Sequence, residues 1–228
     1  MSTPETPRPP TPPSWKIPRW FVNLDAQTQK NLKVYWEELI KFNKTVNLIS
    51  PKTIITADSV HFGDSIKAVQ IVYENNINIK EISDLGSGNG FPGLVLGMMY
   101  PQIKVTLIDV DQRKCEFLKH VISRTGANNV SVSTTNVERF DDNSLQTAIT
   151  RGFASIPKAM MMLRNSVKVG GAIYFLKSEE WSQEVMTLPT QLCSVWTPEV
   201  VGEYSPPESS AKFFVIKATK IANPVQST

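Results

Sequence analysis

The sequence predicts an α/β fold, in which helices cover both faces of a mostly parallel sheet that ends in an antiparallel strand. Three observations predict it. Short apolar strands alternate with helical segments between residues 79 and 188, as is typical of parallel sheets. A turn with three alternating glycines follows the first of these strands. The segments 195–201 and 213–218 then read as a closing antiparallel pair.

Composition limits the classes of protein that the chain can belong to. Its 228 residues suffice for one α/β domain with extensions, and 41% hydrophobic with 20% charged residues is typical of a globular protein. A net charge of +3 permits a nucleic-acid partner without requiring one. Two isolated cysteines and two histidines predict a reducing compartment and no metal site. Since no apolar run is long enough to cross a membrane, we expect a cytoplasmic protein with no membrane partner. We also expect it to be a monomer.

The first part of the chain divides into a tail and a helical region. Residues 1–18 are rich in proline, and we expect a disordered tail there. A helix over 25–42 follows from apolar residues spaced by three and four, with Asp25 as its N-cap. Shorter helices are expected at 53–58 and 61–74. We expect the region 19–76 to cap the ligand edge of the sheet and to form one globular unit with the core, 77–228.

The core is expected to alternate regularly. Strands are predicted at 79–85, 104–108, 130–134, 147–151 and 172–177. Helices are predicted from residue 93 and at 112–124, 156–165 and 179–188. In such sheets the ligand lies beyond the carboxyl ends of the strands, at the point where the strand order reverses.

The glycine turn is the most informative local pattern. Asp84, Gly86, Gly88 and Gly90 form the sequence acid-x-G-x-G-x-G, which resembles the S-adenosylmethionine (SAM) loop of class I methyltransferases. A dinucleotide loop, G-x-G-x-x-G, fits only from Gly88, two residues too late after the strand. A carboxylate there would attract the ammonium of SAM and repel a pyrophosphate. The loop therefore favours a methyltransferase over a nicotinamide dehydrogenase.

Other strand ends supply further candidates. Asp109 can accept both ribose hydroxyls of a cofactor or, alternatively, cap the next helix, and Asp111 is a weaker candidate for the ribose role. Val137 and Glu138 follow the third strand and could hold the adenine edge. Arg151 ends the fourth strand, where its guanidinium could bind the cofactor carboxylate or an RNA phosphate.

A set of motifs follows in order along the chain: Asn43–Leu48, His61–Ser65, Asp84–Gly93, Leu107–Asp109, Lys114 with Phe117–Leu118, Asn129–Val130, Thr150–Ala154, Leu176–Lys177 and Val215–Lys217. Together these motifs resemble the glucose-inhibited division protein B family of bacterial 16S rRNA guanine-N7 methyltransferases. Two positions differ from the usual pattern of that family, with Asn136 in place of an arginine and Ala211 in place of a basic residue before Lys212.

The resemblance implies a class I SAM-dependent methyltransferase that methylates N7 of one guanine in 16S rRNA of the small ribosomal subunit. The cofactor-binding residues are then expected to be Asp84, Gly86, Ser87, Gly88, Gly90, Phe91, Asp109, Val137, Glu138 and Arg151.

The chemistry of N7 fits the absence of a strong acid–base set. N7 carries a free lone pair, so alignment with the methyl group lowers most of the barrier. Candidate catalytic residues are Arg151, His61 and Asp64. Candidate RNA or substrate contacts are Asn43, Asn47, Lys177 and Lys212, with Lys16, Arg19, Lys41 and Lys44 as further phosphate contacts. Two alternatives remain. The protein could methylate another RNA, a protein or a small molecule, or it could be a non-catalytic RNA-binding scaffold.

Overall fold

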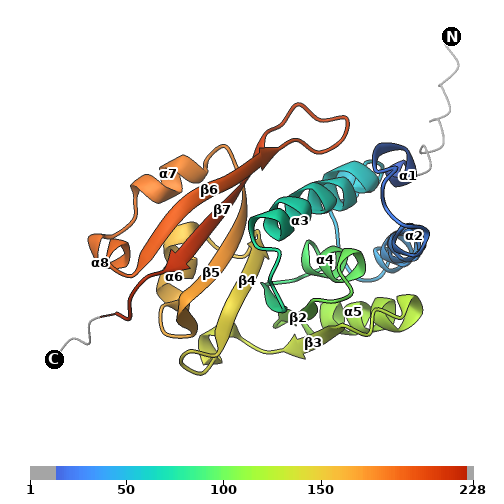
Figure 1. The fold of residues 1–228 in the computed structure, drawn as a ribbon. Coiled ribbons are helices and arrows are strands. Elements are labelled where there is room, and N and C mark those ends of the chain that lie inside the picture. Colours follow the sequence, from blue (N-terminus) through green and yellow to red (C-terminus); the bar gives the residue numbers. More distant parts are fainter. Residues whose placement is uncertain (1–13, 225–228) are drawn as a thin grey trace, which may run out of the picture.

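A seven-stranded sheet runs through the molecule in the order β3-β2-β1-β4-β5-β7-β6 (Figure 1). The computed structural model describes residues 14–224. The first five strands are parallel, and β7 runs antiparallel to both of its neighbours. The expected α/β class and its antiparallel terminal strand are therefore confirmed. The strands are β1 (Glu81–Leu85), β2 (Lys104–Asp109), β3 (Val130–Thr134), β4 (Leu145–Arg151), β5 (Val167–Ser178), β6 (Trp196–Tyr204) and β7 (Phe213–Lys220).

The strand order reverses between β1 and β4. From β1 the chain adds β2 and then β3 on one side of the sheet. It then returns and adds β4 on the other side of β1. Loops leaving β1 and β4 consequently diverge, and a crevice opens at their carboxyl ends. Asp84 pairs with Ile149, so Arg151 lies two residues farther toward this edge.

Helices cover both faces of the sheet (Figure 1). The N-terminal helices α2 and α3 pack with α4 and α5 in one hydrophobic cluster, and α6 contributes to a second. The helices are α1 (Ile17–Trp20), α2 (Ala26–Phe42), η1 (Pro51–Thr53), η2 (Asp58–Gly63), α3 (Asp64–Asn75), α4 (Gly93–Met99), α5 (Gln112–Thr125), η3 (Val137–Arg139), α6 (Ile156–Leu163), α7 (Trp181–Met186) and α8 (Thr190–Cys193).

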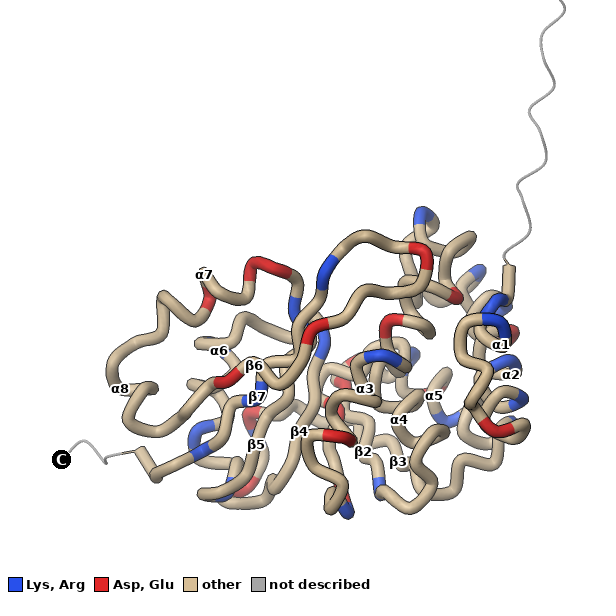
Figure 2. The backbone as a smooth tube through the Cα atoms, turned by 45° about the horizontal axis from the view of Figure 1, so that its top comes forward, with Lys and Arg blue, Asp and Glu red and all other residues tan. Residues whose placement is uncertain are grey.

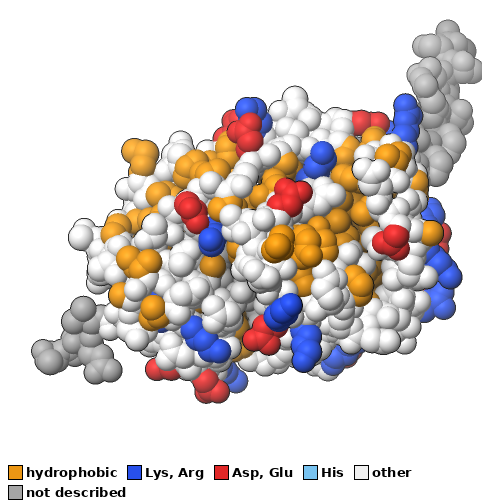
Figure 3. All heavy atoms as spheres, viewed as in Figure 1, with side chains coloured by type: hydrophobic (Ala, Val, Ile, Leu, Met, Phe, Trp, Pro, Cys, Tyr) orange, Lys and Arg blue, Asp and Glu red, His pale blue; other side chains and the backbone are white. Residues whose placement is uncertain are grey.

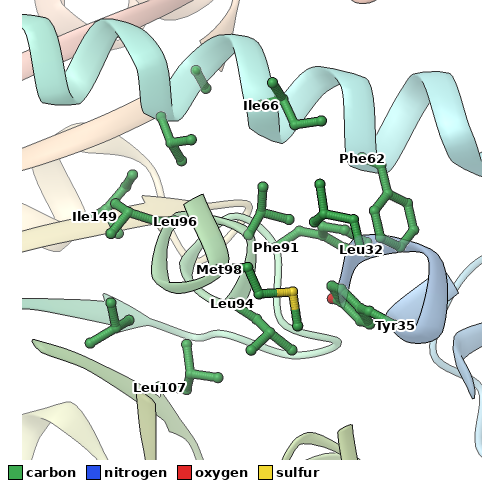
Figure 4. Close-up of a cluster of buried hydrophobic side chains, with 14 of the residues drawn as sticks. Leu32, Tyr35, Phe62, Ile66, Phe91, Leu94, Leu96, Met98, Leu107 and Ile149 are labelled. Carbon is green, nitrogen blue, oxygen red and sulfur yellow. The ribbon is translucent and has the colours of Figure 1, made fainter. Parts of the chain in front are cut away.

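The first hydrophobic cluster joins the N-terminal helices to the glycine loop. Tyr35 of α2, Phe62 of η2 and Phe91 of the loop are almost fully buried and lie against one another (Figure 4). Their ring centroids are 4.9 to 5.1 Å apart. Aromatic contacts at this distance add to the free energy gained from buried area. The loop is thereby held from the helical region as well as from the sheet.

Four details differ from the expectations. No helix spans the expected 53–58, because the 3₁₀ helix η1, capped by Ser50, ends at Thr53 and η2 begins only at Asp58. Residues 14–18 do not belong to a tail, because α1 begins at the fully buried Ile17, and Pro18 fits its first turn. Residues 1–13, the rest of the expected tail, lie outside the described residues. The helix expected from residue 61 begins as a π-helix, η2, and turns α-helical only at Asp64. Strand β5 starts at Val167, five residues before the expected 172, because its first part pairs with Leu145.

Two further findings concern the described part of the chain. No helix within residues 14–224 has the length and apolar character needed to cross a membrane. Over the same residues, no group of three or more histidine, cysteine, aspartate or glutamate side chains could hold a metal ion.

Helix α4 packs closely on the sheet through Gly97. A Cβ atom at this position would lie 2.3 Å from Cγ2 of Val130 and 3.4 Å from Cγ2 of Val105. We expect Gly97→Ala to lower the free energy of unfolding by about 1–3 kcal/mol, because overpacking outweighs the better helix propensity of alanine. Denaturant titration measures this. In a Val130→Ala background, Gly97→Ala should lower the free energy of unfolding much less, because the clashing methyl group is absent. An equal loss of stability in both backgrounds would contradict this explanation.

Candidate active site

The glycine loop turns sharply because three of its residues adopt positive φ angles. These angles are +68° at Gly86, +54° at Gly88 and +102° at Gly90. A Cβ atom at Gly86 would lie 2.8 Å from Cδ2 of Phe153, and one at Gly90 would lie 2.7 Å from the hydroxyl of Tyr35. At Gly88 the nearest atom would be 3.8 Å away. Gly86 and Gly90 are therefore packed tightly against protein, whereas a Cβ atom at Gly88 would make only ordinary van der Waals contacts.

Ser87 holds this loop to the neighbouring strand. Its buried hydroxyl donates to the carbonyl of Asp84 at 2.8 Å and accepts from the backbone N–H of Ile108, also at 2.8 Å. The side chain expected to contact the cofactor is thus turned into the protein. Ser87 shapes the loop, and its hydroxyl does not line the cleft.

Asp84 carries the buried carboxyl group of the site. Its Oδ2 accepts from the N–H of Gly93 at 2.9 Å, and its Oδ1 has no hydrogen-bond partner. Burial raises the pKa of Asp84 to about 7, against the opposing effects of the Gly93 N–H and the positive charge of Arg151. An unpartnered buried carboxylate oxygen is costly in the free protein. A ligand ammonium is the kind of group that would satisfy it.

A cleft of about 300 Å³ opens beside Gly86 and Gly88 at the carboxyl edge of the sheet. Asp109 lies on its wall, where Oδ2 accepts from the N–H of Gly88 at 2.7 Å and Oδ1 accepts from that of Asp111 at 2.8 Å. The helix-cap alternative for Asp109 is not what the structure shows, because Asp111 caps α5. The other lining residues are Ile108, Val110, Lys114, Thr135, Asn136, Val137, Gly152 and Phe153.

Sequence reasoning missed Val110. This apolar side chain is 69% exposed and lines the cleft directly after Asp109. An exposed valine at a ligand-binding edge offers a flat apolar contact for a base or ring. Its position after a strand-end acid was a usable signal, but the sequence could not reveal its exposure.

The two adenine candidates separate in the structure. Val137 is buried and lines the cleft. Glu138 is exposed and lies outside the lining set, and Asn136 binds both its backbone N–H and its carboxylate. The expected cofactor contact through the Glu138 side chain is therefore not present in this geometry, since the tight turn of η3 directs the chain away after Val137.

Arg151 meets the two other catalytic candidates at the end of β4. Its Nη1 donates to Oδ2 of Asp64 at 2.6 Å, and its Nη2 lies 3.4 Å from Nδ1 of His61. The π-helix and the first turn of α3 supply these partners, and single π-turns in helices often occur at functional sites. The guanidinium also lies 5.3 Å from the ring centroid of Phe91.

His61 is electrically neutral in this cluster. Burial, assisted by the charge of Arg151, lowers its pKa to about 3. Its Nε2 lies 3.0 Å from the hydroxyl of Thr53, and its ring stacks on Phe91 at 5.4 Å. A histidine with so low a pKa is a weak proton acceptor at neutral pH. It can orient Arg151 but is unsuited to general-base catalysis.

Phe91 does not contact the cleft, contrary to expectation. Its side chain is 2% exposed and lies in the aromatic cluster beneath Arg151 (Figure 4). The positive φ of Gly90 turns the following residue inward, toward Tyr35. Phe91 therefore supports the arginine from below.

Comparison with known proteins assigns the chain to a family. Residues 28–200 match the sequence pattern of the GidB family, described as rRNA small subunit methyltransferase G. The chain belongs to this family. It is 50% identical to "Ribosomal RNA small subunit methyltransferase G 3" of Bdellovibrio bacteriovorus, with 91% of this chain and 94% of that protein covered. It is 30% identical to "Ribosomal RNA small subunit methyltransferase G" of Halorhodospira halophila, with 75% and 79% covered.

Solved structures agree on the fold. A SAM-dependent methyltransferase from Aquifex aeolicus superposes with a TM-score of 0.55 at 15% identity, covering 75% of this chain and 99% of that one. The class I methyltransferase fold and SAM as the cofactor are thereby confirmed. The residues present fit that cofactor, because the unpartnered Oδ1 of Asp84 and the cleft-lining Gly88 lie at the same edge of the sheet.

The four residues predicted to contact RNA or substrate differ in whether their side chains are free to do so. Asn43 uses its amide within its own loop, accepting from the N–H groups of Leu48 and Ile49 at 2.8 Å. Lys177 is mostly buried and donates to the carbonyl of Ala154 and to Glu184. These two expected RNA contacts are therefore occupied by structural roles. Asn47 is exposed, and Lys212, which is 55% exposed, forms an ion pair with Glu203 at 3.5 Å.

The buried carboxyl of Asp84 predicts that cofactor affinity depends on pH. A ligand ammonium favours the ionised carboxylate, so binding lowers the pKa of Asp84 from about 7 and releases a proton. We expect the affinity for S-adenosylhomocysteine to rise between about pH 6 and 7.5. Calorimetry in buffers of different ionisation enthalpy measures both effects. Asp84→Asn should bind weakly and without this pH dependence, and a flat wild-type profile would contradict the assignment.

The carboxyl group of Asp84 also predicts how the stability of the unliganded protein depends on pH. Stability should fall as the pH rises, whereas the cofactor affinity should increase. The pKa of Asp84 is higher in the folded chain than its ordinary value of 3.8, so the folded state binds more protons between these values. The unliganded protein therefore loses stability as the pH rises through this window. We expect Asp84→Asn to raise the Tm at about pH 8 and to raise it less at about pH 5. Thermal unfolding tests this, and a lower Tm for Asp84→Asn at the higher pH would refute it.

Proposed function

We propose that this GidB-family enzyme transfers the methyl group of SAM to N7 of one guanine in 16S rRNA of the small ribosomal subunit. The chain is an rRNA methyltransferase by family. The observation that carries the proposed mechanism is that Asp84, a buried carboxylate with one unpartnered oxygen at the glycine loop, interacts electrostatically with the strand-end Arg151.

In this proposal the two charges bind the two ends of the cofactor's amino-acid group. Asp84 accepts from the ammonium through Oδ1, and Arg151 donates to the carboxylate. Arg151 lowers the pKa of Asp84, as expected for two opposite charges close enough to interact. Gly86, Gly88 and Gly90 shape the loop, with Gly88 giving the ligand close approach to the backbone.

The rest of the cofactor is proposed to occupy the cleft. The Asp109 carboxylate accepts from the ribose hydroxyls, and Val110 and Val137 contact the adenine. Both Asp109 oxygens already accept one N–H each, which fixes the carboxylate in place. Each carboxylate oxygen retains capacity for a further donor. SAM supplies an activated methyl group when it is bound.

The reaction at N7 needs no base or protein nucleophile. N7 attacks through its own lone pair, so the residues act by alignment and by excluding water. The ionisable side chains that line the cleft are Asp109 and Lys114. Cys115 is fully buried with its Sγ 3.6 Å from the carbonyl of Asp109, so it is poorly placed as a thiolate nucleophile. These features support N7 over C5-pyrimidine methylation.

We propose that exposed lysines and arginines of the N-terminal helical region contact RNA phosphates. Arg19, Lys41 and Lys44 are exposed, and Figure 2 shows basic positions along both α1 and α2. On the face seen in Figure 3, basic and acidic side chains are interspersed, so that face offers no continuous basic surface. We further propose a monomer that acts in the cytoplasm, where its proposed substrate, the small ribosomal subunit, is found.

A methyl-transfer assay with labelled SAM tests the proposal. Its substrates are small subunits from cells lacking the enzyme, naked 16S rRNA, and bulk protein. We expect label as 7-methylguanosine in small-subunit RNA after nuclease digestion. Label in protein or in a different nucleoside would show that guanine N7 is not the acceptor and would contradict the proposal. No transfer to any substrate despite SAM binding would indicate a non-catalytic scaffold.

Substitutions then test the residue roles. Arg151→Ala should lower kcat/KM by at least about 10²-fold, because the methyl donor loses its alignment. Asp109→Asn should raise the KM for SAM about tenfold through weaker ribose binding. The matched acid control is Glu138→Gln. Glu138 is exposed and lies outside the cleft, so this variant should behave as the wild type does. Equal losses in Asp109→Asn and Glu138→Gln would contradict the assignment of Asp109.

A further inference from the structure

Asp64 binds a second residue besides Arg151. Its Oδ2 accepts from Nη1 of Arg151 at 2.6 Å, and its Oδ1 accepts from the hydroxyl of Tyr204 at 2.9 Å. The Asp64 side chain is 5% exposed. The carboxylate is therefore shared, with one oxygen for each donor. Sequence reasoning did not identify Tyr204, which lies 140 residues away in the chain.

The sharing affects how Arg151 is held. A free carboxylate beside a guanidinium tends to bind it through two parallel hydrogen bonds. Here Tyr204 occupies Oδ1, and the hydrogen bond between Asp64 and Arg151 is single. The second terminal nitrogen, Nη2, has only the longer contact of 3.4 Å with the neutral His61. Part of the guanidinium edge thus remains available to a ligand.

Tyr204 is itself held in place at the end of β6. Its side chain is 8% exposed, and its ring stacks on Phe213 at 5.9 Å. Burial, together with the negative charge of Asp64, raises the pKa of Tyr204 well above its ordinary value. The phenol therefore keeps its proton and remains a donor to Asp64.

The loop that follows Tyr204 is fixed on the same helical elements that carry Asp64. It reaches toward α3 and α1 in Figure 1. The carbonyl of Pro207 accepts from the hydroxyl of Ser59, and the Pro207 ring lies so close to Gly63 that a Cβ there would be 2.6 Å from it. Glu208 forms an ion pair with Lys16 at 2.6 Å. These contacts set the position of β6 relative to η2.

We propose that Tyr204 is a positioning residue for the cofactor site. Its hydrogen bond to Oδ1 orients Asp64 so that only Oδ2 binds Arg151, and part of the guanidinium edge is left free for the cofactor carboxylate. This inference rests on the proposed role of Arg151. It assigns a function to the end of β6, which contributes nothing to the lining of the cleft.

The test compares two ligands, of which only one has the carboxylate that Arg151 is proposed to bind. S-Adenosylhomocysteine has the amino-acid carboxylate, and 5′-methylthioadenosine lacks the whole amino-acid end. We expect Tyr204→Phe to weaken S-adenosylhomocysteine binding about 5- to 10-fold. Binding of methylthioadenosine should change less than about twofold. Calorimetry or fluorescence titration gives both dissociation constants.

Tyr174→Phe is the matched control. Tyr174 is also a fully buried strand tyrosine whose hydroxyl donates to a side-chain oxygen, that of Asn75, at 2.9 Å. It lies on β5 and does not line the cofactor cleft. We expect this variant to bind both ligands as the wild type does. Because Tyr204 is proposed to act through Asp64, Tyr204→Phe should cause no further ligand-selective loss in an Asp64→Asn background.

The outcomes separate this inference from the proposed function. Equal weakening of both ligands by Tyr204→Phe would indicate a merely structural role and overturn the inference, as would unchanged binding of both. If Arg151→Ala fails to weaken S-adenosylhomocysteine more than methylthioadenosine, the carboxylate role of Arg151 fails and the inference fails with it. RNA methylation by the wild type is a separate readout, so either conclusion can stand without the other.

Discussion

The hydrogen bond from the Gly93 N–H to the buried carboxylate of Asp84 connects the end of β1 with the start of α4. It closes the glycine loop between them and leaves the second carboxylate oxygen without a partner. Burial disfavours the charged form of Asp84 and so raises the pKa of this carboxyl group. The fold tolerates this cost at the edge where a cationic group of the cofactor can offset it. Stability and ligand binding are thus opposed at a single side chain, as is common at functional sites.

The N-terminal helices stabilise the same loop from the other side. The hydroxyl of Tyr35 donates to the carbonyl of Asn89 at 2.5 Å, and the Asn89 amide donates to the carbonyl of Leu48 at 2.8 Å. The aromatic cluster of Tyr35, Phe62 and Phe91 lies below these bonds. Because the helical region also supplies His61 and Asp64, it positions both the loop and the arginine. A cap of this kind is part of the site and not only a cover for it.

Arg151 and the residues around it come from separate parts of the chain. The glycine loop, the end of β4, the π-helix η2 and the end of β6 converge at one edge of the sheet. Parallel strand order brings the first two together. The contacts of the β6–β7 loop with Ser59 and Lys16 bring the other two into register. The end of β6 is therefore linked to Arg151 through the hydrogen bonds from Tyr204 and Arg151 to Asp64.

The sequence by itself determined the elements and much of the local chemistry. Periodicity placed α2, β3 and the terminal strand pair, since these depend on local patterns of apolar residues. The acid and glycines of the loop were readable because positive φ angles require glycine. Family motifs then singled out His61, Asp64 and Arg151, which the structure brings into contact.

Only the tertiary structure decided which of these side chains face the cleft. Phe91, Asn43 and Lys177 carry suitable groups, yet packing and hydrogen bonds turn them to structural roles. Val110 and Tyr204 have no distinguishing local pattern, because their roles depend on exposure and on a partner distant in the sequence. Orientation of this kind arises from contacts between elements, and the spacing of residues along a chain does not encode it locally.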